Sequence, residues 1–250
     1  MSKELIRLRD LTMEFDGERI LDGINLYIND HEFLTLLGPS GCGKTTTLRI
    51  IGGFLNPTSG TVLFDGKPVN DVPPYQRQVN TVFQRYALFP HLNVFDNIAF
   101  GLKIKKEPKD VIKQKVMRML RLVNLEDYAD RSVTEMSGGQ QQRCALSRIL
   151  VNEPEVLLLD EPFSALDTLT KSAMHKWYLN VMEKIRLSTL FITHDIDEAI
   201  LLSDRIYILS GSPGRISGEI ADISIVTSDN PRSEEPEEII SEIEEGLQGI

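Results

Sequence analysis

One stretch restricts the fold of this chain more than any other, the glycine-rich segment GPSGCGKT at residues 38–45. It follows FLTLL, an apolar run typical of a strand buried on both faces, and precedes a helical pattern over residues 45–52. The segment fits G-x-x-x-x-G-K-[ST], in which backbone N–H groups converge on phosphate oxygens, a lysine neutralises charge and a hydroxyl ligates Mg²⁺. The sequence therefore predicts a strand–loop–helix unit that binds the phosphates of a nucleotide.

A second apolar strand supplies the acids that such a site needs. VLLLDEP ends in Asp160 and Glu161, and the carboxyl edge of a sheet lies beside a phosphate loop. We expect Asp160 to hold Mg²⁺ through water and Glu161 to polarise an attacking water as general base. His194 follows the strand TLFIT and Gln84 ends the strand VNTVF. His194 could reach the γ-phosphate, although a single histidine is more often structural. Gln84 could contact Mg²⁺ or the attacking water, but taken alone it indicates nothing.

Another candidate phosphate site opens the helix-forming stretch EMSGGQQQRCALSRIL, where Ser137-Gly138-Gly139 precedes the apolar periodicity. The free N–H groups and the positive end of a helix dipole favour an anion. One chain thus carries two candidate phosphate sites, and the sequence order alone does not say whether they serve one nucleotide.

Composition excludes several classes of protein. No apolar run approaches the roughly 20 residues that span a bilayer, and the charged N-terminus lacks the apolar core of a signal peptide. Two cysteines define no disulfide framework, and four scattered histidines define no metal cluster. Ten acids and one arginine from residue 219 onward give −9 of the net charge of −10, so the rest is near neutral. We therefore expect no nucleic-acid partner.

The order of patterns predicts an α/β fold. Turn signals at Asp16-Gly17 and Asp65-Gly66 separate β-rich runs in the first part of the chain, which indicates an N-terminal antiparallel β-subdomain. Residues from about 91 to 152 are mainly helical, and buried strands then return, so we expect a helical subdomain inserted into a mainly parallel sheet.

The acidic end of the chain leaves two interpretations open. We expect residues 1–220 to form the main domain and residues 221–250 an acidic tail, with no separate regulatory β-domain. The tail is either a solvated C-terminus or a helix that docks a stripe of apolar residues on the body. The stripe consists of Ile239, Ile240, Ile243 and Leu247.

Together these motifs resemble the ATP-binding cassette (ABC) ATPase family over about residues 4–220. MSGGQ at 136–140 matches the family's signature motif, with Met136 in place of the usual leucine. SALD at 164–167 resembles the loop after the catalytic acid, and ITHD at 192–195 resembles the switch-histidine segment. The motifs also occur in the family's order along the chain.

The resemblance implies a P-loop NTPase (RecA-like) core that hydrolyses ATP with Mg²⁺. It implies a homodimer, or a pair of cassettes, packed head to tail around two ATP molecules. The implied catalytic residues are Glu161, His194 and Gln84, and the implied Mg²⁺ ligands are Thr45, Gln84 and Asp160. The implied ATP-binding residues are Phe15 against the adenine, Gly38, Pro39, Ser40, Gly41, Cys42, Gly43, Lys44, Thr45 and Thr46 in the phosphate loop, and Ser137, Gly138, Gly139, Gln140 and Asp167.

Two segments point to different importers within the family. Residues 79–102 are similar to ATPases of polyamine and maltose importers, whereas residues 193–220 are similar to those of taurine, sulfonate and nitrate importers. Because polyamine and maltose relatives continue into a C-terminal β-domain, we give more weight to the length and the ending. We predict an importer ATPase for a small organic solute or anion of the taurine, sulfonate or nitrate kind. The alternatives are a polyamine-type importer ATPase, a non-transport ABC ATPase and a nucleotide-binding regulator without turnover.

The resemblance also implies partners. An integral membrane permease would contact the chain near Tyr86, Leu88 and Phe89, which otherwise serve to bury the helical subdomain. A substrate-binding protein would act indirectly through that permease. These partners imply a peripheral protein at the cytoplasmic face of the cell membrane.

Overall fold

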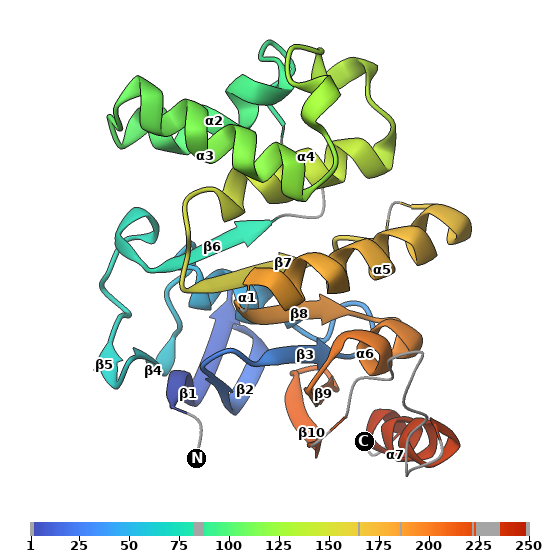
Figure 1. Cartoon of the computed structure of the whole chain (residues 1–250). Helices are drawn as coiled ribbons and strands as arrows, with labels where there is room; N and C mark the ends of the chain where they lie inside the picture. Colours follow the sequence, from blue (N-terminus) through green and yellow to red (C-terminus); the bar gives the residue numbers. More distant parts are fainter. Residues whose placement is uncertain are drawn as a thin grey trace. The chain divides into compact units, whose positions relative to one another are not determined.

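A computed structural model describes residues 3–82, 88–164, 166–185, 187–221, 223 and 236–248 (Figure 1). Contacts group the chain into two units. Unit 1 comprises Met1–Val79, Val156–Asp160 and Leu187–Ile250, and unit 2 comprises Asn80–Glu155 and Glu161–Arg186. Each unit is described by itself.

The first sheet of unit 1 is antiparallel, as predicted. It has the order β2-β1-β4-β5. Its strands are β1 (Glu4–Phe15), β2 (Glu18–Asn29), β4 (Ser59–Phe64) and β5 (Lys67–Pro68). Asp16 and Gly17 join β1 to β2 with φ angles of 50° and 85°, and Asp65 and Gly66 join β4 to β5 with 49° and 73°. A two-residue turn with positive φ matches the twist of a hairpin, which explains why these dipeptides mark the turns.

The second sheet of unit 1 carries the parallel strands, in the order β10-β9-β3-β8-β7. β3 pairs in parallel with β8 and β9, β8 pairs in parallel with β7, and β10 pairs antiparallel with β9. The strands are β3 (Phe33–Leu37), β7 (Val156–Asp160), β8 (Ser188–Thr193), β9 (Arg205–Ser210) and β10 (Arg215–Ile220). Every residue of β3, β7, β8 and β9 is buried. This explains their continuous apolar character.

Two helices of unit 1 follow strands of this sheet. α1 (Lys44–Ile51) follows β3, and α6 (Ile196–Leu202) follows β8. A short 3₁₀ turn, Pro74–Gln76, precedes β6 (Val79–Val82). The first residue of β6 belongs to unit 1 and its other residues belong to unit 2. The prediction of an α/β fold with a strand–loop–helix unit is confirmed, with the bounds of β3 and α1 within one residue of those expected.

The described regular structure of unit 2 is helical, apart from the residues of β6 that belong to it. Its helices are α2 (Val94–Ile104), α3 (Lys109–Leu122), α4 (Gly138–Leu150) and α5 (Thr168–Ile185), with 3₁₀ turns at Glu126–Tyr128 and Val133–Glu135. α3 buries Ile112, Val116 and Leu120, which share one face of the helix. Unit 2 also includes α5, which lies beyond the stretch at about 91–152.

The acidic end of the chain forms a docked helix, α7 (Pro236–Gln248). Ile239 and Ile243 are buried in a cluster with apolar residues of β9 and β10, among them Ile206 and Ile220. A Cβ on Gly246 would lie 2.6 Å from Ile208 Cδ1, so α7 approaches β9 closely. Of the two interpretations of the tail, the structure shows the docked helix. No described helix is both long enough and apolar enough to cross a membrane.

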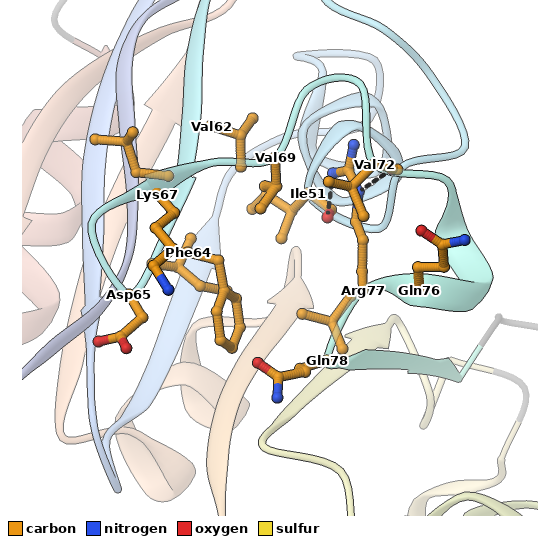
Figure 2. A pocket seen from close by; sticks show the side chains of 13 residues that line it. Ile51, Val62, Phe64, Asp65, Lys67, Val69, Val72, Gln76, Arg77 and Gln78 are labelled. Carbon is orange, nitrogen blue, oxygen red and sulfur yellow. Dashed lines mark hydrogen bonds between the residues drawn. The ribbon is translucent and has the colours of Figure 1, made fainter.

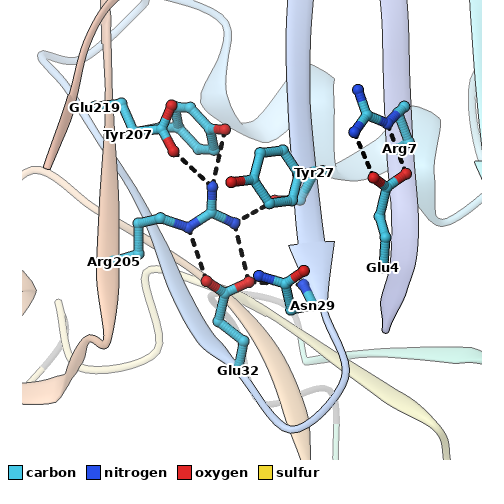
Figure 3. Close-up of polar contacts among 8 residues, drawn as sticks. All are labelled: Glu4, Arg7, Tyr27, Asn29, Glu32, Arg205, Tyr207 and Glu219. Carbon is cyan, nitrogen blue, oxygen red and sulfur yellow. Dashed lines mark hydrogen bonds and ion pairs between the residues drawn. The ribbon is translucent and has the colours of Figure 1, made fainter. Parts of the chain in front are cut away.

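Arg205 of β9 connects several elements of unit 1 (Figure 3). Its guanidinium donates to both carboxylate oxygens of Glu32, at 2.7 and 2.9 Å, and to Glu219 Oε1 at 2.7 Å. Two further bonds reach Tyr27 O and the Tyr207 hydroxyl. Burial alone would lower the pKa of Arg205, but the bonds to Glu32 and Glu219 raise it above its ordinary value. The two carboxylates therefore stabilise the charge of Arg205 against the cost of its burial.

We expect Arg205→Met to lower the free energy of unfolding by about 3–5 kcal/mol, because it leaves the Glu32 carboxylate, whose side chain is only 10% exposed, without its cation. Arg215→Met is the matched control. It breaks the exposed ion pair with Asp22, and should cost about 0–1 kcal/mol. Urea unfolding of both variants measures the difference. Equal losses would show that Arg205 contributes no more than a surface charge.

Candidate nucleotide-binding site

The glycine-rich loop between β3 and α1 encloses its own lysine. Lys44 Nζ donates to Gly38 O at 2.7 Å and to Pro39 O at 2.8 Å, and the side chain is buried. These carbonyls hold the ammonium group inside the loop, at the N-terminal end of α1. A cation there adds to the positive end of the helix dipole, so the loop favours phosphate.

Two glycines of the loop are required by close contacts. A Cβ on Gly38 would lie 2.1 Å from Leu209 O, and one on Gly43 would lie 2.4 Å from Leu21 Cδ2. Gly43 also has φ of 100°, in the left-handed region that favours glycine. The pattern of glycines thus fixes how the loop lies against β2 and β9.

Three parallel strands bring candidate residues to one edge of the sheet. Leu37 of β3 pairs with Thr193 of β8, and Ile192 of β8 pairs with Asp160 of β7. The loop, His194 and Asp160 therefore lie at the same edge, as the sequence predicts. The His194 side chain is exposed there.

Thr45 and Asp160 make direct contact at this edge. Thr45 Oγ1 donates to Asp160 Oδ1 at 2.9 Å, and Asp160 is buried. A hydroxyl and a carboxylate offer the hard oxygen atoms that Mg²⁺ prefers. In the described ranges, no group of three or more His, Cys, Asp and Glu side chains gathers as a metal cluster. The pair fits a Mg²⁺ that takes its other ligands from phosphate and water.

Glu161 has an unusual backbone conformation. Its φ is +45°, and its carbonyl accepts hydrogen bonds from Ser164 N and Ser164 Oγ at 3.2 and 2.8 Å. A positive φ is uncommon for a residue other than glycine, and the described part of the chain also shows it at Glu153. The turn made with Ser164 holds this conformation directly after Asp160.

The SGG motif opens α4 through a capping box. Gln140 N donates to Ser137 Oγ at 3.4 Å, and Ser137 N donates to Gln140 Oε1 at 3.0 Å. Ser137 and Gly138 are exposed, whereas Met136 is buried, so methionine in place of leucine is a conservative change in the core. The prediction that the motif forms a helix N-terminus is confirmed.

Three further predicted residues have clear surroundings. The Asp167 carboxylate accepts bonds from Thr170 Oγ1 and N, which lower its pKa and place it at the start of α5. Phe15 is 42% exposed at the end of β1. Cys42 is buried, and burial raises the pKa of its thiol. The remaining loop residues Ser40, Gly41 and Thr46 lie in or directly after the same loop.

The expected permease contact is described only in part, because Tyr86 lies outside the described residues, and so does Gln84, the predicted contact to Mg²⁺ or water. Phe89 packs on Phe100 of α2, with ring centroids 4.4 Å apart, and Arg148 Cζ lies 5.1 Å from its ring. Phe89 therefore helps to bury the helical unit, and Leu88 is half-buried.

Two polar residues were not predicted. Gln142 of α4 is buried and donates to Pro162 O at 3.1 Å, which links α4 to the turn after Glu161 within unit 2. Arg77 of unit 1 contacts α1. Neither residue was singled out in the sequence analysis. Each makes its contact with a residue distant in sequence, so the local sequence carries no signal for that contact.

The strand–loop–helix unit and the acid at the end of β7 define a P-loop nucleotide-binding protein. A family profile described as ABC transporter matches residues 21–164, and the chain belongs to this family. It is 56% identical over 209 residues to the spermidine/putrescine import ATP-binding protein PotA of Clostridium novyi (strain NT), and 55% identical over 210 residues to that of Desulfitobacterium hafniense (strain Y51). Each match covers 84% of this chain but 60% of the relative. The chain thus spans about 60% of the length of these curated relatives.

Solved structures share the fold. CbiO1 from Clostridium perfringens, part of the ABC transporter complex cbiONQ, has a TM-score of 0.79 and 31% identity, and the match covers 88% of this chain and 89% of that one. The ATP-binding cassette MJ0796, solved as a dimer bound to ADP and Pi, has a TM-score of 0.74 and 31% identity, with 87% and 98% covered.

The relatives correct one prediction. They are spermidine/putrescine import proteins, so the prediction of a taurine, sulfonate or nitrate relative is wrong. The polyamine-like character of residues 79–102 agrees with them. Residues 193–220 include β9, which is buried at every position. Such residues are selected mainly by packing and indicate little about substrate.

Proposed function

We propose that this chain hydrolyses ATP and drives a polyamine importer, as its relatives' names indicate for them. The observation that carries the ATPase assignment is the Thr45–Asp160 contact beside the buried Lys44. It combines a cation for the phosphates with oxygen ligands for Mg²⁺ at one sheet edge. When bound, Mg²⁺ neutralises charge on the phosphates during transfer.

The chain's own residues have distinct roles in this proposal. Lys44 exchanges its carbonyl contacts for phosphate oxygens, and Phe15 stacks on the adenine. Glu161 orients and polarises the attacking water, and His194 contacts the γ-phosphate from the neighbouring strand end. Gln84 contacts Mg²⁺ or that water.

We further propose that Ser137, Gly138 and Gly139 bind the ATP of a second copy. The N–H groups of Ser137 and Gln140 bond to each other's side chains in the capping box. The N–H groups of Gly138 and Gly139 have no acceptor within the helix, because they belong to its first turn. A dimeric structure of the similar cassette MJ0796 supports this arrangement. Asp167, at the start of α5, lies in the same unit as Ser137, Gly138 and Gly139, and we propose that it helps them to bind this ATP.

The transported substrate is proposed from the relatives. Spermidine and putrescine are organic polycations, whereas taurine is a zwitterion whose sulfonate and ammonium charges cancel, so the two assignments predict cargo of different net charge. We propose that Tyr86, Leu88 and Phe89 contact a membrane permease at the cytoplasmic face, with Phe89 also supporting the helical unit. A substrate-binding protein delivers the cargo to that permease.

Glu161→Gln should lower ATP turnover by about 100-fold or more, because the amide does not accept a proton. Nucleotide binding should persist, so the variant accumulates as an ATP-bound dimer on size-exclusion chromatography. Glu155→Gln, at the exposed residue before β7, is the matched control. An unaffected rate in Glu161→Gln would remove the base role.

The two-copy arrangement is tested by mixing inactive variants. Lys44→Ala disables the phosphate loop and Ser137→Arg disables the helix N-terminus. In a mixed dimer, one site combines both lesions and the other site has neither, so mixing should restore ATPase activity. If both elements served one nucleotide in the same chain, no mixture would regain activity.

The cargo is tested by transport. Vesicles that hold the chain with its copurifying permease and the matching binding protein should take up labelled putrescine or spermidine on ATP addition. Taurine should not be transported. ATP-driven uptake of taurine without polyamine uptake would overturn the polyamine assignment and leave the ATPase assignment intact.

A further inference from the structure

The guanidinium of Arg77 binds the C-terminal end of α1. Nη1 donates to Ile50 O and Ile51 O, both at 2.8 Å, Nε donates to Val72 O at 2.8 Å, and Nη2 donates to Asn70 O at 3.1 Å. Figure 2 shows the guanidinium of Arg77 near Ile51 and Val72. Arg77 thus joins the end of α1 to residues 70–72, which lie on the way to β6.

The chain provides a specific place for this side chain. Gly53 has φ of 77°, and a Cβ there would lie 2.5 Å from Arg77 Nε. Burial lowers the pKa of Arg77, but the carbonyls at the negative end of the α1 dipole favour the cation. Arg77 therefore acts on α1 by charge as well as by geometry.

The residue after Arg77 connects the chain to β7 and so to the Thr45–Asp160 pair. The next residue, Gln78, accepts a bond from Val156 N of β7 at 3.3 Å. β7 ends at Asp160, which accepts the bond from Thr45 near the start of α1. The helix and the strand are thus connected at both ends, by Thr45–Asp160 at one end and by Arg77 and Gln78 at the other.

Packing does not replace the polar connection at Arg77. A cavity of about 310 Å³ is lined by Arg77 together with Ile51, Phe64, Val69 and Val79 (Figure 2). Apolar contact between the end of α1 and the segment before β6 is therefore incomplete. An eight-residue helix is too short to be stable without its surroundings, so its buried face and its two ends together determine where it lies.

We propose that Arg77 is a positioning residue that sets the spacing between Thr45 and Asp160 and so tunes their affinity for the nucleotide-bound metal ion. The inference rests on the proposed function. Arg77 touches neither nucleotide nor metal and acts only through α1 and β7.

The test measures metal binding without turnover. Mn²⁺ replaces Mg²⁺, and electron paramagnetic resonance follows its binding to the full chain with a non-hydrolysable ATP analogue. Arg77→Met should weaken Mn²⁺ binding by about 10-fold, as expected for loss of a residue that orients metal ligands. Affinity for the analogue in EDTA should remain unchanged.

The controls separate positioning from loss of structure. Arg49→Met removes an exposed arginine from the same last turn of α1 and should change nothing. Gly53→Ala displaces the Arg77 side chain and should weaken Mn²⁺ binding in the same way. Arg77→Lys should not restore it, since a single ammonium group does not span all four carbonyls.

Three results would decide against the inference or its basis. Unchanged Mn²⁺ affinity in a folded Arg77→Met overturns it, and so does an equal loss of affinity for the analogue in EDTA. If Arg77→Met does not fold by circular dichroism, Gly53→Ala and Arg77→Lys decide in its place by the same two criteria. Failure of the wild type to bind Mn²⁺ with the analogue would overturn the proposed function itself.

Discussion

The parallel pairing of β3, β8 and β7 determines where the chemistry of this chain can take place. These strands are short and buried at every residue, so their register is fixed by the core. The pairs Leu37–Thr193 and Ile192–Asp160 bring the residues that follow each strand to one edge. The phosphate loop, Asp160 and His194 depend on that register, because a shift by one residue would turn every side chain of a strand to the opposite face.

The sequence best predicts those parts of the structure in which the backbone conformation requires particular residue types. The glycine-rich loop, the Asp-Gly turns and the helix start at Ser137 each need particular residue types at neighbouring positions. Local sequence therefore predicts them with their bounds. The continuous apolar character of the strands likewise predicts burial on both faces, and with it the α/β fold.

Contacts between distant residues could not be predicted in the same way. Arg77 lies 27 positions from Ile50, and Arg205 lies 173 positions from Glu32. An arginine in either place is equally typical of an exposed surface, and only the folded chain shows its acceptors. The stripe of α7 was visible in the sequence, but its docking depends on space beside Ile208, where Gly246 has no side chain. Roles assigned by motif alone, as for Glu161 and Asp167, remain predictions for the same reason.

The two phosphate-binding features differ in how complete they are. The loop of β3 and α1 holds a buried lysine and lies beside an acid that contacts Thr45, so it offers charge, N–H groups and metal ligands together. At the N-terminal end of α4, the Ser137 hydroxyl already accepts a bond from Gln140 N. This end therefore offers an anion mainly the N–H groups of two glycines and the helix dipole. A helix end in water binds an anion weakly, because salt and solvent screen it. It becomes effective once a phosphate that is already neutralised by a lysine and a metal ion is enclosed against it, away from water. This physical asymmetry favours the assignment of the α4 terminus to a nucleotide that another copy has already bound.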